Sequence, residues 1–274
     1  MKTWKLIASA LVIASSSSFA QQMDVRLELT HSAFVLGEPI VVKIWVANNS
    51  RSPMVIEPNS ADKIEIEITR ETDQTELDSR NSAPFFPATK INPGQIAQQN
   101  IEIDKWFTLC DAGKYLIQAV VIKGGMRFET RKRAFDIVPG IPLKEGLQMF
   151  VDKQHLQRKF QLVYWMREQA NRLFLRIEDS PTAQAWDTID LGVLSKVTEP
   201  KLDISPKGEV TVIHRSTQDA FIRTVIWSLP KAIEIAERNV LVDPDVSSSE
   251  RVRSLYSEMQ KEEKKADKPW WKFW

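Results

Sequence analysis

The sequence predicts a mostly β protein: an Ig-like antiparallel sandwich, then a second small β-sheet domain and a C-terminal helix. Three observations lead to this prediction. Apolar and polar residues alternate with a period of two in short runs, turn formers separate the runs, and helical spacing replaces the alternation only at residues 143–155 and near the C-terminus. A period of two places one face of a strand against a core and the other in water, which is typical of antiparallel sheets.

Residues 1–20 have the three-part pattern of a secretory signal peptide. Two lysines precede the nine-residue apolar run Leu6–Ala14, and the small residues Ser18 and Ala20 precede the expected cleavage after Ala20. Nine apolar residues are too few to cross a bilayer, which takes about 20. We therefore expect an exported protein, periplasmic or secreted, with an uncleaved anchor as the alternative.

Size and charge limit the remaining chain. Cleavage would leave 254 of the 274 residues, enough for two domains with sizeable cores. Loss of the two N-terminal lysines would leave 35 basic residues against 36 acidic ones, so there is no electrostatic reason to expect nucleic acid as a partner. Cys110 is the only cysteine, which excludes an intramolecular disulfide. We expect its thiol to be buried as a small apolar group, with a reactive or partner-linked thiol as the alternative.

The first predicted domain, residues 21–140, contains the clearest alternation. Candidate strands lie around residues 25–29, 40–46 and 63–69, and they are separated by Gly-Glu-Pro, Asn-Asn-Ser, Glu-Pro-Asn and Pro-Gly turns. Several short strands at this spacing indicate a sandwich. Glu65 and Glu67 fall on one face of their strand and three isoleucines on the other, so a solvated sheet face accounts for these paired carboxylates.

Two local motifs refine the prediction for this domain. Gly37 and Pro39 frame a turn that leads into a strand, and Gly113 and Tyr115 mark a turn followed by the start of another strand. A tyrosine in this place can donate its hydroxyl to the backbone of the preceding loop, as in the tyrosine corner of Ig-like sandwiches. We therefore assign these four residues a structural role.

The Gly-Glu-Pro-Ile, Asn-Asn-Ser, Pro-Gly and Asp-x-Gly-x-Tyr motifs together resemble secreted bacterial Ig-like domains. Proteinase-inhibitor-type and macroglobulin-like domains share the same plan. The resemblance covers most of residues 21–140 and implies the fold of that segment. One sandwich hosts many roles, and no inhibitory loop can be matched residue by residue, so the resemblance assigns no activity.

Pro139, Gly140 and Pro142 predict a short, stiff boundary before the second domain, residues 141–245. A short helix is predicted over residues 143–155, with Leu147, Phe150 and Val151 on one face. Strands are predicted to follow. Residues 160–165 and 172–177 form a hairpin, and further strands lie at 186–192, 209–214, 221–227 and 232–242. The segment is too short for a closed β-propeller, so a small β-sheet domain is the better interpretation.

The C-terminal segment has a different character. A capping box at Ser247 and Glu250 starts a charged helix over residues 246–268, and residues 269–274 form an aromatic tail. The tail contains Trp270, Trp271, Phe273 and Trp274, residue types that favour surfaces apolar on one side and wet on the other. We expect the tail to bind an envelope partner or a membrane surface; packing on its own chain and disorder are the alternatives.

No motif in the sequence indicates a metal, a cofactor or a catalytic residue. His31, His155 and His214 occur in no metal-binding spacing, and there is no Gly-x-Ser-x-Gly or phosphate-binding loop. Residues 243–247 resemble the start of a calcium loop but lack its sixth-position Gly and twelfth-position Glu.

These observations predict an exported, non-enzymatic binding or scaffold protein of a bacterial cell envelope, which presents sandwich surfaces and its tail to a protein or glycan. A secreted proteinase inhibitor is the first alternative and rests on the resemblance. The second is an envelope hydrolase with a site between the domains, which would need His155, His214, Asp187 or Asp190 in one deep pocket.

Overall fold

The computed structural model describes residues 23–57, 62–81, 83–150, 157–180 and 184–242. Within them the chain is mostly β, as predicted, and nearly all of its strand pairs are antiparallel. The only helix in these ranges is a 3₁₀ turn, η1 (Ile103–Lys105). The predicted helix 246–268 and the aromatic tail 269–274 lie outside the described residues.

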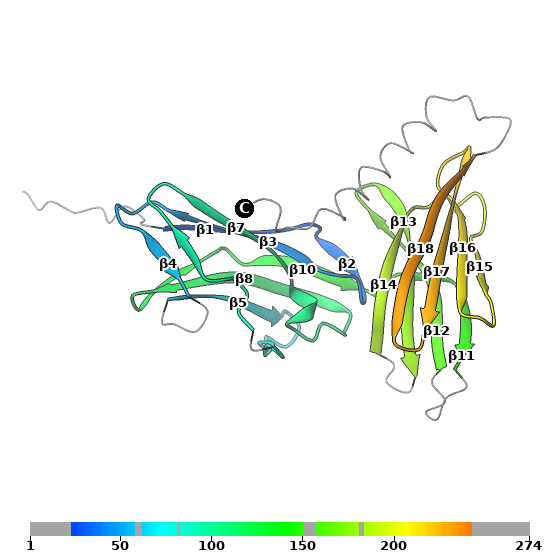
Figure 1. The fold of residues 1–274 in the computed structure, drawn as a ribbon, viewed down its shortest axis with the longest axis horizontal. Coiled ribbons are helices and arrows are strands. Elements are labelled where there is room, and N and C mark those ends of the chain that lie inside the picture. Colours follow the sequence, from blue (N-terminus) through cyan, green and yellow to red (C-terminus); the bar gives the residue numbers. More distant parts are fainter. Residues whose placement is uncertain (1–22, 58–61, 82, 151–156, 181–183, 243–274) are drawn as a thin grey trace, which may run out of the picture.

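Ten strands make up what we call the N-terminal half. They form a three-stranded sheet in the order β1-β3-β7, a second sheet in the order β2-β10-β8-β5 with β9 on β8, and a small β4–β6 pair (Figure 1). Their bounds are β1 (Met23–Leu29), β2 (Ala33–Val35), β3 (Val41–Asn48), β4 (Met54–Ile56), β5 (Lys63–Arg70), β6 (Thr89–Ile91), β7 (Ile96–Glu102), β8 (Gly113–Lys123), β9 (Met126–Glu129) and β10 (Arg133–Val138).

Alternation of side chains explains why these segments form strands. In β5 the isoleucines at 64, 66 and 68 are buried and the residues between them are only partly buried, which confirms the predicted pattern. β3 alternates in the same way. The buried residues of both large sheets form one hydrophobic core, which is the main source of stability in this half because apolar burial contributes about 25 cal/mol per Å².

Eight strands make up the C-terminal half. They form two antiparallel four-stranded sheets in the orders β11-β12-β13-β14 and β15-β16-β17-β18. Their bounds are β11 (Ile141–Met149), β12 (Gln157–Arg167), β13 (Ala170–Ser180), β14 (Gln184–Val193), β15 (Lys201–Ile204), β16 (Glu209–Arg215), β17 (Ala220–Leu229) and β18 (Ala232–Val242). The predicted strands of this half are all present, and β11 and β15 were not predicted as strands.

The predicted hairpin is confirmed by the pairing of β12 with β13. Its turn is Glu168-Gln169, and both residues have positive φ, at 50° and 67°. This conformation matches the right-handed twist of the strands that it joins. The buried residues of the two sheets share a second hydrophobic core.

The predicted helix over residues 143–155 is wrong where the structure describes it, because Ile141–Met149 is strand β11. This strand pairs along its length with β12, and Gly146 lies so close to Ile204 that a Cβ added there would come within 2.5 Å of Ile204 Cδ1. The helical spacing of Leu147, Phe150 and Val151 was a weak pattern. Pairing with the buried strand β12 outweighs it, because tertiary context overrides local preference.

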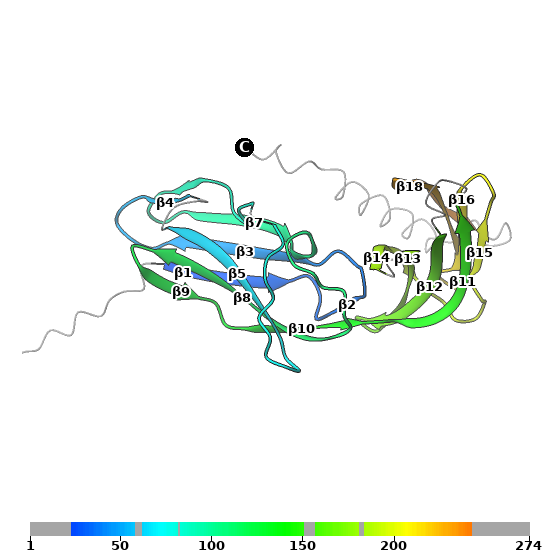
Figure 2. The ribbon, with the colours of Figure 1, turned by 90° about the horizontal axis from the view of Figure 1, so that it is seen from below.

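The two halves are joined directly. Only Pro139 and Gly140 separate β10 from β11, and Gly140 has φ +71° with Val163 close beside it. β2 pairs in parallel with β10, so both strands end at the same place. Figures 1 and 2 show that these ends point at the sheet that contains β12, β13 and β14.

Candidate functional site

A buried ion pair joins the two halves at this place. Arg167, at the end of β12, donates from Nη1 and Nη2 to the two carboxylate oxygens of Glu38, at 2.8 and 2.5 Å. The side chains of Arg167 and Glu38 are only 6% and 9% exposed. A bidentate arginine–carboxylate pair fixes both distance and orientation, so the two halves are held in one arrangement.

The turn after β2 positions Glu38. Gly37 has φ +82°, and the N–H of Glu38 donates to the carbonyl of Val35 at 2.8 Å, which closes a tight turn over residues 35–38. Such a turn requires a residue that tolerates positive φ at its third position, which explains Gly37. The Glu38 carboxylate also accepts the N–H of Val35 at 2.9 Å. The predicted Gly37–Pro39 turn is therefore the segment that delivers Glu38 to the junction, while Pro39 itself is exposed.

The groups around the ion pair are mostly apolar and exclude water from it; the exception is Asp190, whose Oδ2 lies 4.0 Å from the Nη1 of Arg167. The Arg167 guanidinium lies 6.0 Å from the ring centroid of Phe34 and 5.2 Å from that of Phe174, one ring from each half. Val35 packs with Val163 and Phe174 in a small buried cluster. Burial in an apolar site strengthens the attraction between the charges, although removing both from water is costly.

Three further polar contacts cross the junction. Thr188 donates its hydroxyl to the carbonyl of Leu36 at 2.7 Å, and the Arg176 Nη1 donates to the carbonyl of Pro139 at 2.9 Å. The Nδ1 of His31 lies 3.1 Å from a carboxylate oxygen of Glu168 at the exposed rim. His31 is therefore a junction residue.

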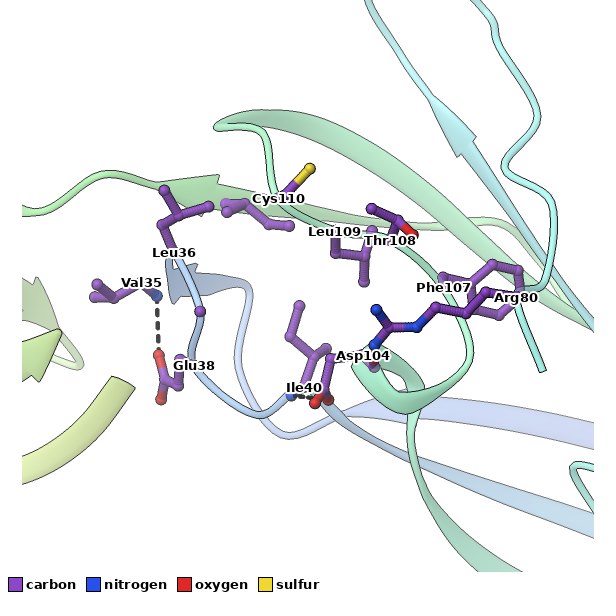
Figure 3. Close-up of a pocket in the computed structure, with 12 residues that line it drawn as sticks. Val35, Leu36, Glu38, Ile40, Arg80, Asp104, Phe107, Thr108, Leu109 and Cys110 are labelled. Carbon is purple, nitrogen blue, oxygen red and sulfur yellow. Dashed lines mark hydrogen bonds between the residues drawn. The ribbon is translucent and has the colours of Figure 1, made fainter. Parts of the chain in front are cut away.

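A pocket of about 130 Å³ lies beside the junction, between the Glu38 turn and the segment from Asp104 to Cys110 (Figure 3). Asp104 accepts the N–H of Ile40 at 2.9 Å, and Arg80 donates to the backbone carbonyl of Asp104. Burial raises the pKa of the Asp104 carboxyl, although the hydrogen bond from Ile40 acts in the opposite sense. All residues that line this pocket belong to the N-terminal half.

The expected burial of Cys110 is wrong, because its thiol is exposed at this pocket. The neighbouring Leu109 is 9% exposed and Phe107 is 2% exposed, so these residues occupy the core beneath the segment. A cysteine next to a larger aliphatic side chain has less apolar area to bury, and it takes the outward position.

Asp187 belongs to the C-terminal half, and its environment resembles that of Asp104. Burial raises the pKa of the Asp187 carboxyl, and the charge of Asp104 raises it further. Asp190 instead accepts from Arg172 at 2.8 Å and from the N–H of Gly192 at 2.8 Å. Neither Asp187 nor Asp190 lines the pocket of Figure 3.

His214 lies inside the C-terminal half and is 1% exposed. Among the described residues, neither ring nitrogen makes a hydrogen bond of good geometry. Burial lowers the pKa of His214 to about 4; the charge of Arg238 also lowers it, while the backbone of Val193 and the charge of Asp190 act in the opposite sense. The imidazole is therefore neutral at neutral pH, and it does not line the pocket.

The structural role expected for Tyr115 is present. Its hydroxyl donates to the carbonyl of Asp111 at 2.8 Å, and its ring stacks on Phe135 with centroids 5.5 Å apart. Gly113 is not a turn residue, because it already lies in β8 opposite Ile137. The four tail residues Trp270, Trp271, Phe273 and Trp274, together with His155 and the calcium-like loop at 243–247, lie outside the described residues.

The described ranges contain neither a cluster of metal-binding side chains nor a membrane-spanning helix. No three His, Cys, Asp or Glu side chains come together there as a group that could hold a metal ion. No helix in the same part of the chain is long and apolar enough to cross a membrane.

Glu67 accepts from Gln118 and from Arg127, the latter at 2.6 Å, so it belongs to a polar network on the outer sheet face.

Comparisons with known proteins give little guidance. No family model and no curated protein sequence matches the chain. One similar structure is the alkylpurine DNA glycosylase AlkC of Pseudomonas fluorescens bound to abasic-site DNA, 16% identical over 42% of this chain and 30% of that chain, with TM-score 0.27. Another is the sporulation control protein Spo0M of Bacillus subtilis, 9% identical over 88% of this chain and 98% of that one, with TM-score 0.29. Both scores are too low to support an argument about fold or function.

Reasoning from the sequence missed the ion pair at the junction. Glu38 and Arg167 are 129 residues apart, and neither stands in a motif that names its partner. The one available signal was the Gly-Glu-Pro turn, which placed an acidic residue at the start of a strand.

Proposed function

We propose that this chain is an exported, non-enzymatic binding or scaffold protein of a bacterial cell envelope. Its two halves would act as a single rigid body that presents sheet faces, and an aromatic tail, to a protein or glycan. The buried Glu38–Arg167 pair is the observation that carries the proposal, because it makes the relative position of the two halves a defined feature. Presenting several surfaces at once requires such a fixed arrangement.

We also propose that residues 21–140 form an Ig-like sandwich and residues 141–245 a second β-rich domain. The shared core of the two large sheets and the Tyr115 hydrogen bond support an Ig-like sandwich for residues 21–140. The two four-stranded sheets around their own core support a second β-rich domain over residues 141–245. Export is supported by the signal-peptide pattern of residues 1–20.

Expression with and without residues 1–20 tests export. We expect the full chain in the periplasmic or culture fraction, shortened by cleavage after Ala20, and the truncated chain in the cytoplasm. Mass spectrometry of the recovered protein checks the cleavage position. An uncleaved chain that sediments with membranes would support the anchor alternative.

Binding through the tail is tested by pull-down from envelope extract and by co-sedimentation with lipid vesicles. The full chain is compared with a chain that ends at Lys268 and with a K272A variant, which keeps all four aromatic residues. We expect the truncation to lose the partner or vesicle and K272A to keep it, since the aromatic rings supply most of the contact area. Equal recovery by all three proteins would refute tail docking.

The hydrolase alternative is supported by one observation, the raised pKa values of Asp104 and Asp187 on opposite sides of the junction. Incubation with glycan and peptide substrates tests it. Turnover by the wild type that is lost in both D104N and D187N would replace the binding proposal. The inhibitor alternative is tested with a protease panel, and uniformly unchanged rates would remove it.

A further inference from the structure

Trp45 lies at the centre of the outer face of the β1-β3-β7 sheet. The strand register places it between Arg26 of β1 and Gln98 of β7. Its neighbours along β3, Ile44 and Val46, are fully buried, so Trp45 is on the opposite side of the sheet, away from the core. An indole ring therefore stands in the middle of a surface made by the outward-facing side chains of three strands, which we call the Trp45 platform.

The ring is held in place at its edge. Its Nε1–H donates to Oε1 of Gln98 at 2.9 Å, which limits rotation of the indole. The ammonium of Lys43 lies 4.8 Å from the ring centroid. A lysine head group on a long flexible stem can move aside at small cost, since an exposed cation–π contact is worth only about 0.5–1 kcal/mol. A fixed ring with a removable cover is suited to receive a flat ligand.

The charges of the Trp45 platform cancel. Arg26 pairs with Asp24 of the same strand at 2.7 Å, and Glu28 stands opposite Lys43 in the register. Glu102, at the end of β7, is on the same face and pairs with Lys105 at 2.6 Å. Three acidic and three basic side chains leave no net charge to attract an anionic membrane or an acidic polymer. A ligand without net charge fits this surface best.

Hydrogen-bonding groups flank the ring on the β7 side. Gln98 and Asn100 are both exposed and face outward, and each offers a donor and an acceptor. Ile96, on the same edge, is 65% exposed. One aromatic face, amide groups around it and little net charge match a sugar ring, which presents C–H groups on its face and hydroxyls on its rim.

The outer face of the β15–β18 sheet has a different chemistry. Trp227 is 38% exposed there, and Leu229, two residues further along β17 on the same side, is 44% exposed. Two large apolar side chains next to each other favour contact with another protein, because the centre of a protein interface is enriched in aromatic and apolar groups. The Trp45 platform has one aromatic ring among polar groups, which favours a glycan.

We propose that the Trp45 platform binds a neutral glycan, with the indole stacked on a sugar ring and Gln98 and Asn100 bonded to its hydroxyls. This proposal rests on the proposed binding function and names a ligand class and a surface for it. The residues of this surface are not those of the aromatic tail, so either idea can fail while the other stands.

Calorimetric titration of the full chain tests the proposal, with neutral hexasaccharides of β-1,4-glucose, α-1,4-glucose and β-1,4-N-acetylglucosamine as probes. We expect at least one to bind with a dissociation constant below about 5 mM, and W45A to weaken it about tenfold or more. W45F keeps an aromatic face and should retain most of the affinity. W227A, a matched change on the other sheet face, should leave it unchanged.

Circular dichroism and thermal melting of each variant show whether it is folded, and Q98A serves as a second variant that spares the ring. We expect Q98A to weaken sugar binding by about threefold to tenfold. Binding of no probe by the folded wild type would overturn the proposal, as would equal weakening by W45A and W227A. The fluorescence of Trp45 is measured as the part of the signal that W45F removes. If neither the full chain nor the chain ending at Lys268 binds a sugar, and this part is weaker in the full chain, the surface is assigned to the tail. If the wild type binds no sugar but is exported and docks through its tail as expected, this inference alone is refuted and the proposed function stands.

Discussion

The interiors of the two halves differ in how much polar chemistry they contain. Among the described residues, three of the buried polar or charged side chains belong to the N-terminal half, and eight belong to the C-terminal half. The first half is therefore stabilised by apolar burial with a few polar contacts. The second half encloses groups that must find partners, because a buried polar group without a hydrogen bond is costly.

Arg158 shows how the C-terminal half meets this requirement. It is completely buried, and it donates to both carboxylate oxygens of Asp179 at 2.7 and 2.9 Å. Its Nη1 also donates to the hydroxyl of Ser228 at 3.0 Å and the carbonyl of Leu229 at 2.8 Å, which belong to the other sheet. One side chain thus connects two sheets. The difference between the halves predicts that the C-terminal half is more sensitive to single substitutions and to pH.

The largest effect is expected from Arg158→Ala. Removing one partner of a buried ion pair leaves the other without compensation, so we expect a loss of about 4 kcal/mol in the free energy of unfolding. Urea denaturation followed by circular dichroism measures it. The matched control is Lys159→Ala, at the residue that follows Arg158. It removes an exposed ion pair with Glu145 and should cost at most about 1 kcal/mol. A loss below about 1 kcal/mol for Arg158→Ala would contradict the comparison.

Glu38→Ala tests the junction and should cost about 3 kcal/mol, because Arg167 then remains buried and keeps only the more distant Asp190 carboxylate, at 4.0 Å. We also expect the two halves to lose their fixed arrangement, which small-angle scattering would report as a larger radius of gyration. Glu28→Ala, on an exposed position of β1, is the control and should change neither quantity. An unchanged scattering curve for Glu38→Ala would show that the ion pair does not hold the halves together.

Acid should destabilise the C-terminal half through His214. Its pKa is lowered from 6.5 to about 4 in the folded protein, so folding favours the neutral ring. The stabilisation is complete above pH 6.5 and is lost as the pH falls towards 4, with a loss of about 2 kcal/mol between pH 7 and pH 5. Urea midpoints at the two pH values measure this loss. In His214→Asn we expect this part of the pH dependence to vanish, and an unchanged slope would point to other titrating groups.

The smallest effect is expected from Tyr115→Phe in the N-terminal half. The change removes one hydrogen bond to the Asp111 carbonyl and leaves the stacked ring in place, so the expected cost is about 1 kcal/mol. Asn48→Ala serves for comparison, since its side-chain amide donates to two backbone carbonyls and should cost more. If Tyr115→Phe matched the wild type, the hydrogen bond would contribute nothing to stability.

The strands could be predicted from the sequence wherever alternation was strong. Ile64, Ile66 and Ile68 define β5 because a period of two has one interpretation when one face is buried. β11 was missed because most of its side chains are exposed, so its sequence does not alternate between apolar and polar residues. This segment is a strand because its backbone pairs with β12. The burial predicted for Cys110 was wrong because the neighbouring Leu109 occupies the core instead, and the sequence does not show which of the two side chains points inward.

The junction could not be predicted for a different physical reason. The attraction between Glu38 and Arg167 depends on how two folded halves meet, and no local property of the Gly-Glu-Pro turn or of the β12–β13 hairpin contains that geometry. The Trp45 platform could be predicted from the sequence only in part. The alternation of β3 already places Trp45 opposite the buried Ile44 and Val46, but its neighbours Arg26 and Gln98 follow only from the strand register.

The two-residue connection of Pro139 and Gly140 has a mechanical consequence. The linker between β10 and β11 is too short to extend, so tension along the backbone is transmitted directly from one sheet to the next. The parallel β2–β10 pair anchors the same point a second time. Neither half can therefore open without loading the other, and a heating scan should show one heat-absorption peak in place of two. A pull on one sheet would therefore be transmitted to the other sheet through this connection.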